Sequence, residues 1–313
     1  MSSEPLLPAL DQRAELLAIA GELRPELHRY CSRLMGSITD GEDVVQDTFD
    51  RAFVALETTQ SADAVVLRPW LFRIAHNRAL DLLRGRTLRV AEPIEAAFDT
   101  ADPASPDPAE MLIHQEAVAT AVSRFAELPT LQRSVVVLKD VLDESLSDIA
   151  ALLDLTIDAV KGHLARGRTR LRVINAQAAP PSEFPALSAA VMRYAQLFNR
   201  RDWDGLRALL ADDVKLNQSL HPARAGAADV GLFFSIYAKS DRVWLVPAWL
   251  EGREVIAVFE PPSASKPSYL MWLEWHEGRI SFIRDYRYVR YVVAEADLRW
   301  NPGAAVAGTS PHP

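Results

Sequence analysis

Apolar residues recur at three- and four-residue steps through the first part of the chain, and this spacing predicts a run of helices. Residues 13–36 carry one apolar stripe, and residues 40–53 carry a second that opens on an acidic segment. Residues 58–66 interrupt the pattern, and Pro69 then stands where a first helical turn accepts proline. The helix predicted after Pro69 is amphipathic and basic. We therefore expect an all-α unit over residues 9–89.

Two shorter apolar stripes between residues 140 and 172 predict a pair of helices joined by a tight turn. Ser145 or Ser147 can cap the first helix, and Asp154-Leu155-Thr156 supplies the turn. The second helix ends in five cations with no acidic residue among them, a pattern that suits phosphate. These cations are Lys161, Arg166, Arg168, Arg170 and Arg172. The segment predicts a helix-turn-helix, and the alternative is a solvated amphipathic hairpin with a basic end.

The pattern changes after Ala179-Pro180-Pro181, which marks a domain boundary. A helical stretch over 187–210 is followed by alternating segments rich in Trp and Tyr, the last of them a strand expected over 280–293, with Gly252 and Gly278 among the turns. Helices that lead into an antiparallel sheet predict an α+β domain over 183–300. We expect residues 301–313 to be a disordered tail.

Charge is distributed unevenly along a chain whose net charge is −8. Residues 68–89 hold six arginines and one acid, Asp81, whereas residues 92–116 hold seven acids and no Lys or Arg. We interpret residues 90–110, which are also rich in proline, as a solvated acidic linker. The alternative is that this tract shields basic faces or imitates nucleic acid. The net charge argues against indiscriminate binding to nucleic acid.

Composition excludes several classes of protein. No apolar run is long enough to span a bilayer, and the N-terminus lacks the pattern of a signal peptide, so a cytoplasmic location is predicted. The single cysteine, Cys31, excludes an internal disulfide and a Cys-cluster metal site. Its apolar neighbours predict a buried core thiol. We expect neither a metal nor a cofactor.

Three segments, in order, resemble bacterial RNA polymerase sigma factors of the extracytoplasmic-function type. GEDVVQDTFDRAF (41–53) resembles their polymerase-binding helix, and RPWLFRIAHNRALDLLRGR (68–86) resembles the segment that opens and reads the minus-ten element. Residues 128–172 resemble the helix-turn-helix domain that docks on the minus-thirty-five element. The resemblance implies sigma region 2 over 9–89 and region 4 over 111–178.

The resemblance also implies three sets of binding residues. The polymerase-binding set forms an acidic ridge of Asp43, Gln46, Asp47 and Asp50. The alternative interpretation of these residues is a solvated helix face. The minus-ten set combines cations for phosphate with Asn77 as a base reader: Arg73, Asn77, Asp81, Arg84 and Arg86. The minus-thirty-five set lies on the second helix of the helix-turn-helix and consists of Lys161, His163, Arg166, Arg168 and Arg170. For His163 the alternative interpretation is a neutral surface histidine. We expect Trp70, Leu71, Phe72 and Ile74 to pack the core.

The C-terminal part resembles the SnoaL-like members of the nuclear transport factor two superfamily, through residues 191–216 and 280–296. Related folds include cyclases and isomerases with an Asp or His base in a cone-shaped pocket. The candidates here are Asp212, Asp213, His221, His276 and Asp285. Asp212-Asp213 is expected instead to cap or turn between helix and strand. Trp244, Trp249, Trp272 and Trp275 are expected to fill the cone, and no set strong enough for catalysis is evident.

Two functions from different classes follow. The first is a promoter-specificity subunit that joins core RNA polymerase and promoter DNA, has no catalytic chemistry, and carries a C-terminal regulatory domain that responds to a small ligand or a protein. The second is a cyclase- or isomerase-like enzyme with an N-terminal targeting module. A duplex-binding repressor is a third option, weakened because it has no need of a melting segment at 68–86.

Overall fold

The computed structural model describes residues 7–58, 64–87, 117, 120–177, 186–239 and 242–300. The chain forms two compact units, residues 1–180 and 181–313. The predicted linker over 90–110 and the predicted tail over 301–313 lie outside the described residues.

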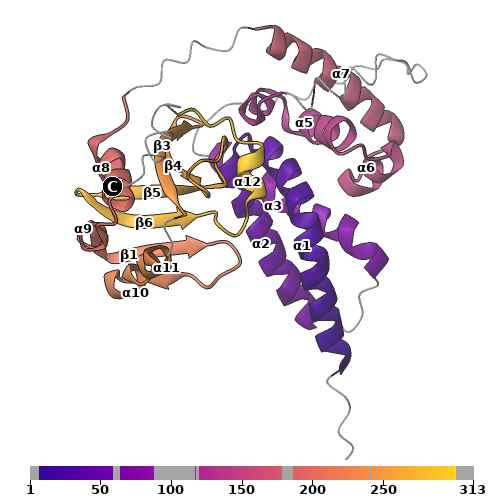
Figure 1. Ribbon diagram of the computed structural model, residues 1–313. Helices are drawn as coiled ribbons and strands as arrows, with labels where there is room; N and C mark the ends of the chain where they lie inside the picture. The colour runs from indigo at the N-terminus through magenta and orange to yellow at the C-terminus, as the bar shows by residue number, and fades with distance from the viewer. Residues whose placement is uncertain are drawn as a thin grey trace, which may run out of the picture. The chain divides into compact units, whose positions relative to one another are not determined.

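The first unit is all-α (Figure 1). It opens with three long helices, α1 (Leu7–Met35), α2 (Ile38–Thr58) and α3 (Ala64–Thr87). A 3₁₀ helix, η1 (Val122–Glu127), then leads to α5 (Thr130–Val136) and a π-helical turn, η2 (Val137–Val141). The helix-turn-helix follows as α6 (Leu146–Leu153) and α7 (Ile157–Ala176). The two predicted all-α parts are confirmed.

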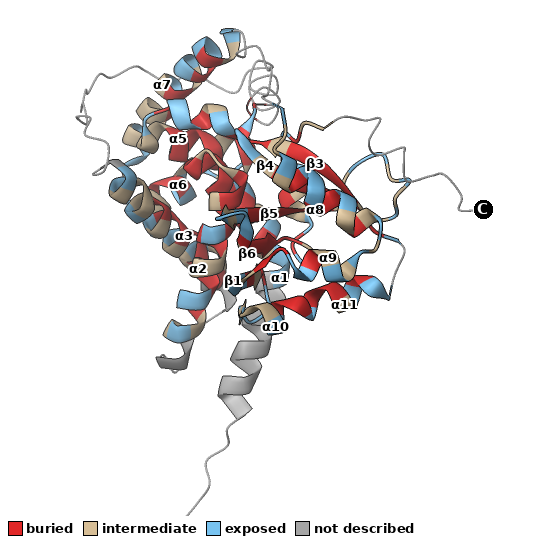
Figure 2. Ribbon diagram, turned by 90° about the vertical axis from the view of Figure 1, so that its left-hand side faces the viewer, coloured by how far each residue is buried: buried red, intermediate tan, exposed pale blue. Residues whose placement is uncertain are grey.

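Helices α1 and α2 approach closely because Gly41 has no side chain. A Cβ at Gly41 would lie 2.5 Å from the Cα of Ser32. The apolar stripes of both helices meet α3 in a single core that continues into α5, α6 and α7, shown in red in Figure 2. Cys31 is fully buried in that core, as predicted. Burial of so much apolar surface is the main force that holds the unit together.

Helix α3 begins at Ala64, which is five residues before Pro69. The expectation that Pro69 stands in the first turn is therefore wrong. Leu67 is buried in the core and anchors this additional N-terminal turn. Packing of an apolar residue there outweighs the hydrogen bond that a proline inside a helix forgoes.

The second unit is an α+β domain, so the predicted fold class is confirmed. Its helices are α8 (Ala189–Asn199), α9 (Trp203–Arg207), α10 (Ala227–Gly231), α11 (Phe233–Ala238) and α12 (Tyr291–Ala294). Its strands are β1 (Leu210–Gln218), β2 (Arg224–Ala225), β3 (Trp244–Leu250), β4 (Arg253–Phe259), β5 (Tyr269–His276) and β6 (Arg279–Asp285). The sheet order is β2-β1-β6-β5-β4-β3, with β1 and β6 parallel and the other pairs antiparallel.

Three local predictions in this unit are wrong. The helix expected over 187–210 is two helices, because Arg201 takes a left-handed conformation (φ 58°) and Asp202 caps α9. The strand expected over 280–293 ends at Asp285, whose side chain accepts a hydrogen bond from the Arg287 amide in the turn that follows. Asp212 and Asp213 do not cap a helix, because they lie exposed in an irregular part of β1.

Aromatic side chains from α8 and α11 fill the core on one face of the sheet. Phe198, Phe233 and Tyr237 are buried, with ring centroids 5.1 Å apart for both pairs that involve Tyr237. The four tryptophans expected to fill this space are instead half-buried, and Trp275 packs against the edge of the core. Tyr and Phe rings from the helices therefore occupy the interior that was assigned to tryptophan.

Candidate polymerase- and nucleic-acid-binding surfaces

Helix α2 presents the predicted acidic ridge to solvent. Asp43 and Asp50 are exposed, and Gln46 and Asp47 are half-buried, while the apolar residues on the other side of the helix enter the core. Asp47 accepts a hydrogen bond from Arg78 of α3 at 2.6 Å. Partial burial and the neighbouring Asp47 charge raise the pKa of Asp50 above its usual value. A ridge of this kind suits a basic helical partner.

Helix α3 carries four of the five predicted minus-ten residues along one exposed stripe, Arg73, Asn77, Asp81 and Arg84. Arg86 is also exposed, but it lies on another side of the helix. Leu71 and Phe72 are buried on the opposite side, as predicted, and Trp70 is half-buried. Arg84 lies 3.6 Å from Asp81, and Arg86 lies 2.9 Å from Asp40 of α2. Helical periodicity therefore separates a core face from a polar face on this segment.

Side-chain caps start both helices of the helix-turn-helix. The Ser145 side chain accepts from the Asp148 amide at the start of α6, and the Thr156 side chain accepts from the Ala159 amide at the start of α7. Asp154 ends α6 in the left-handed conformation (φ 55°). Local residues therefore fix the start of both helices and the end of α6.

Helix α7 holds the five predicted minus-thirty-five residues in different surroundings. Arg170 is exposed, while Lys161, His163 and Arg166 are half-buried. Burial and the nearby charge of Arg166 lower the pKa of His163, which favours the neutral imidazole at neutral pH. Arg168 differs from the rest, because its guanidinium binds Asp140 through two hydrogen bonds of 2.6 and 2.9 Å. Asp140 is only 3% exposed, so this pair secures α7 to η2.

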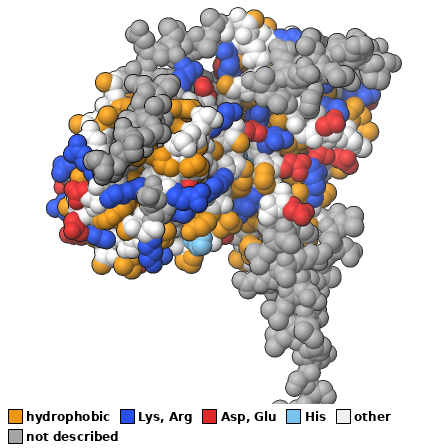
Figure 3. Space-filling model, viewed as in Figure 1, with side chains coloured by type: hydrophobic (Ala, Val, Ile, Leu, Met, Phe, Trp, Pro, Cys, Tyr) orange, Lys and Arg blue, Asp and Glu red, His pale blue; other side chains and the backbone are white. Residues whose placement is uncertain are grey.

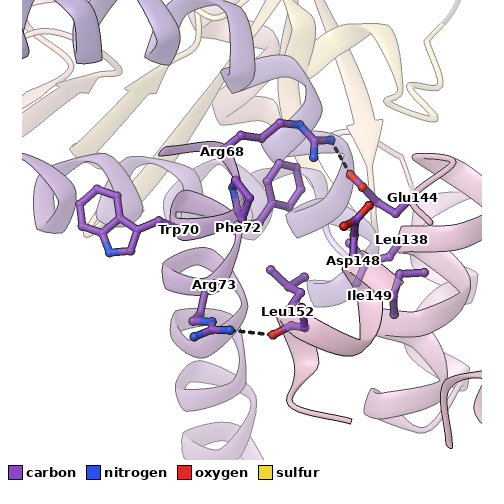
Figure 4. A pocket seen from close by; sticks show the side chains of 11 residues that line it. Arg68, Trp70, Phe72, Arg73, Leu138, Glu144, Asp148, Ile149 and Leu152 are labelled. Atoms are coloured by element: carbon purple, nitrogen blue, oxygen red, sulfur yellow. Dashed lines mark hydrogen bonds and ion pairs between the residues drawn. The ribbon is translucent and has the colours of Figure 1, made fainter. Parts of the chain in front are cut away.

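A cavity of about 520 Å³ lies between α3 and α6 (Figure 4). Apolar and aromatic side chains form much of its wall, among them Phe72, Leu138 and Leu152. Arg68 points across it to Glu144, and Arg73 points to the backbone of α6. The sequence gives no signal for this cavity, because it is formed by segments about 76 residues apart.

His76 and Tyr30 form a buried polar pair that sequence reasoning missed. The Tyr30 hydroxyl lies 2.7 Å from Nδ1 of His76, and both side chains are buried. Burial, aided by the positive charge of Arg84, lowers the pKa of His76 to about 4. His76 is therefore neutral in the folded unit at neutral pH and serves the core, next to the exposed Asn77.

In the second unit the five candidate acids and bases are dispersed. Asp212, Asp213, His221 and His276 are exposed, and the His221 ring contacts the Tyr288 ring in a tilted arrangement, with centroids 4.1 Å apart. Asp285 alone among these five is buried. Its carboxylate accepts from Gln218 at 2.7 Å and lies 3.5 Å from the Tyr237 hydroxyl, which contacts the Tyr269 hydroxyl at 3.0 Å. Burial raises the pKa of Asp285 to about 6.

Charge on the face shown in Figure 3 is mixed, with basic and acidic side chains side by side. Within the described part of the chain, His, Cys, Asp and Glu form no group of three that could hold a metal ion. A search of the same residues also finds no helix with the length and apolar character needed to cross a membrane.

Two family models match the first unit. Sigma-70 region 2 matches residues 19–89, and sigma-70 region 4 matches residues 120–171. The ECF RNA polymerase sigma factor SigG of Mycobacterium tuberculosis is 32% identical over 233 residues, which are 66% of this chain and 62% of SigG. RNA polymerase sigma factor CnrH of Cupriavidus metallidurans is 35% identical over 143 residues, which are 44% of this chain and 73% of CnrH. The chain thus spans less than two thirds of SigG.

Two solved structures are also similar. The extracytoplasmic function sigma factor SigJ of Mycobacterium tuberculosis aligns over 93% of this chain and 98% of its own, at 18% identity and a TM-score of 0.33. A protein of Kribbella flavida described as a ketosteroid isomerase aligns over 31% of this chain and 74% of its own, at 24% identity and a TM-score of 0.26. TM-scores this low carry no argument about the fold. The fold of each unit is therefore assigned from its own helices, strands and sheet order.

Proposed function

Because the chain belongs to the extracytoplasmic-function family of RNA polymerase sigma factors, we propose that it binds core RNA polymerase and directs promoter-specific initiation of transcription. The observation that carries the proposal is the presence of region 2 and region 4, in that order, on one compact unit. The proposed domain limits, 9–89 for region 2 and 111–178 for region 4, contain the matched residues 19–89 and 120–171.

Each surface has a role in this proposal. The α2 ridge of Asp43, Gln46, Asp47 and Asp50 would bind a basic helical surface of core polymerase. The α3 stripe would hold the unstacked minus-ten strand, with Asn77 on a base edge and cations on phosphates. The stripe consists of Arg73, Asn77, Asp81 and Arg84, and Arg86 at the end of the helix would add a further phosphate contact. In the minus-thirty-five duplex, Lys161, His163 and Arg166 would face bases, and Arg170 would lie on phosphate. Arg168 would reach phosphate only on leaving its bond to Asp140.

The role of Arg170 on phosphate can be tested by its salt dependence. Replacing Arg170 with alanine should weaken promoter binding by the polymerase–chain complex and reduce the log–log salt slope by about 1, since one phosphate contact is lost. Arg193→Ala is the matched control, because it removes an exposed arginine from α8 in the second unit. Filter binding or anisotropy at several salt concentrations measures both slopes. Equal slopes for wild type and Arg170→Ala contradict this role.

We further propose that the C-terminal domain regulates the sigma unit and does not catalyse a reaction. Two features support this: four of the five candidate acids and bases are exposed at separate places, and the buried Asp285 is already bonded to Gln218 and the Arg287 amide. Regulation would operate in the cytoplasm through a small ligand or a protein bound to this domain.

Removal of residues 182–313 should change the output of run-off transcription with purified core polymerase. The comparison is made at equal protein concentration over a library of promoters, so that promoter choice and total output are both read. Unchanged output and promoter choice refute the regulatory role. The alternative enzyme is tested by substituting Asp213, His221 and Asp285 together. Retained folding and transcription support the sigma assignment.

A further inference from the structure

The guanidinium of Arg168 in α7 is held by a buried carboxylate of the same unit. Its Nε and Nη2 donate to the two oxygens of Asp140 at 2.9 and 2.6 Å. The side chains of Arg168 and Asp140 are 18% and 3% exposed. Two hydrogen bonds to one carboxylate fix the direction of a guanidinium as well as its distance. The pair therefore fixes one point of α7 against η2.

Asp140 lies in a part of the backbone that departs from the regular α-helix. In η2 the Leu142 amide donates to the carbonyl of Val137, five residues before it, at 3.1 Å. Turns of this π-helical kind are rare, and they occur frequently at functional sites. The irregular turn of η2 thus carries the carboxylate that holds Arg168.

A close contact between α5 and α7 lies beside the ion pair. Gln132, Val136 and Asp140 follow one another at four-residue steps, so they lie on one side of α5 and η2. A Cβ at Gly167 would lie 2.6 Å from Cγ2 of Val136 and 3.3 Å from the Gln132 carbonyl oxygen. Because Gly167 and Arg168 are neighbours in sequence, the close contact and the ion pair act at the same place. Together they set the distance and the rotation of α7.

The residues that would read bases lie further towards the N-terminus of α7. Lys161 and Arg166 precede Arg168 by seven and two residues. At about 1.5 Å per residue, Lys161 is about 10 Å from Arg168 along the helix axis. A rotation of α7 at Arg168 would displace both side chains at once. Hydrogen bonds to base edges need donors held within about 0.5 Å of the productive geometry, so the pair is placed to control this readout.

Transfer of Arg168 to a phosphate would break this arrangement. The resemblance to sigma factors implies a DNA contact for Arg168, but both hydrogen bonds to Asp140 would then be lost. The Asp140 carboxylate would stay buried without them, and a buried charge that loses its partner is strongly unfavourable. Arg170 is exposed on the same helix and can contact phosphate without such a loss. The geometry thus favours an Arg168 that stays on Asp140.

We propose that Asp140 and Arg168 form a positioning pair, which stays bonded in the promoter complex and sets how α7 lies in the major groove. Asp140 is then a specificity-determining residue that does not touch DNA. The inference rests on the proposed function, because it requires α7 to read the minus-thirty-five element.

The test compares two conservative variants in the complex of core polymerase with the full chain. Arg168→Lys keeps the charge and loses the fork of donors, whereas Asp140→Asn keeps the shape and loses the carboxylate charge. Filter binding measures the affinity for a duplex with the minus-thirty-five element selected from the promoter library, and for the same duplex with that element scrambled. Both variants should lower the preference for the selected element about three- to thirtyfold. The log–log salt slope should stay that of wild type, since no phosphate contact is lost.

A phosphate contact by Arg168 predicts different results. Asp140→Asn would release Arg168, tighten binding to both duplexes and steepen the salt slope by about 1. Arg168→Lys would keep the preference of wild type, because lysine binds phosphate as a point charge. Either result overturns the proposal.

Asp143→Asn is the matched control. Asp143 lies three residues after Asp140, is 81% exposed and pairs with Lys139 at 3.2 Å. Its replacement removes the same charge from an exposed position nearby, so the preference should stay that of wild type. Circular dichroism and thermal unfolding show whether each variant is folded. A loss of preference in Asp143→Asn as large as that in Asp140→Asn overturns the proposal.

Hydrogen exchange of the free chain gives a second readout that needs neither polymerase nor DNA. Asp140→Asn should speed exchange of the α7 amides about three- to tenfold relative to those of α8, because α7 loses its bond to η2. Unchanged exchange overturns the proposal. A wild-type complex that prefers no element of the library contradicts the proposed function. A preference in wild type that both variants retain contradicts the positioning pair alone.

Discussion

Asp285 is a residue whose surroundings change its acid–base chemistry. The carboxyl group is fully buried, and its pKa of about 6 lies above that of an exposed aspartate, about 3.9. The folded state therefore holds a proton that the unfolded chain has already released between these two values. Stability linked to Asp285 is fully present below pH 4 and is lost as the pH rises through about 6.

Asp285→Asn should remove this pH dependence from the C-terminal domain. A shift of about 2 units corresponds to about 3 kcal/mol, so the variant should be more stable than wild type by up to that amount at pH 7.5, by about half as much at pH 5, and little different at pH 4. Denaturant unfolding of the full chain, followed by tryptophan fluorescence, measures the difference. Asp213→Asn serves as the control because Asp213 is exposed on β1. Parallel pH profiles for wild type and Asp285→Asn contradict the account.

Single residues differ in how far the sequence reveals their roles. The exposure of Arg73, Asn77 and Arg84 follows from helical periodicity, which needs only local information. The bonds of Arg68 to Glu144 and of Arg168 to Asp140 do not follow, because their partners are 76 and 28 residues away. Sequence alone therefore predicts which side of a helix a cation occupies, but not the partner that engages it.

At the scale of elements, the two glycines of α7 have different structural roles. A Cβ at Gly167 would lie 2.6 Å from Cγ2 of Val136 and 3.3 Å from the carbonyl oxygen of Gln132, so α7 packs closely on α5 there. A Cβ at Gly162 would lie 3.4 Å from the flexible end of Arg166. The first glycine is required by packing, and the second only lowers helix propensity.

Gly167→Ala should destabilise the first unit by about 1–3 kcal/mol, the usual cost of an overpacked core. Gly162→Ala should instead stabilise it by about 0.5–1 kcal/mol, because alanine favours the helix. Thermal and denaturant unfolding of the full chain compare the two variants. If Gly167→Ala is as stable as wild type, the close contact between α5 and α7 is wrong.

The helix-turn-helix could be predicted from the sequence because its determinants are local. Ser145 and Thr156 cap the two helices, and the turn at Asp154 lies between the apolar stripes. Prediction fails where tertiary contacts decide. The helix expected over 187–210 breaks near Asn199, whose side chain bonds the backbone of Leu245 in β3. The Asp202 cap of α9 is a local signal for this break, whereas the contact of Asn199 with β3 has none.

At the scale of the whole molecule, the sequence predicts two all-α parts and a following α+β domain, and the structure confirms this order. What it could not predict is that regions 2 and 4 share one core and one cavity. That packing is made by contacts between residues far apart in sequence, which periodicity does not encode.

The central claim is that this chain gives core RNA polymerase the ability to open a promoter. The most direct measurement places 2-aminopurine in the minus-ten element and follows its fluorescence with core polymerase, with and without the full chain. The account predicts a rise in fluorescence that needs both proteins, because the probe leaves the base stack, and a smaller rise with Arg73→Ala and Asn77→Ala combined. An equal signal in the presence and absence of the chain contradicts the account.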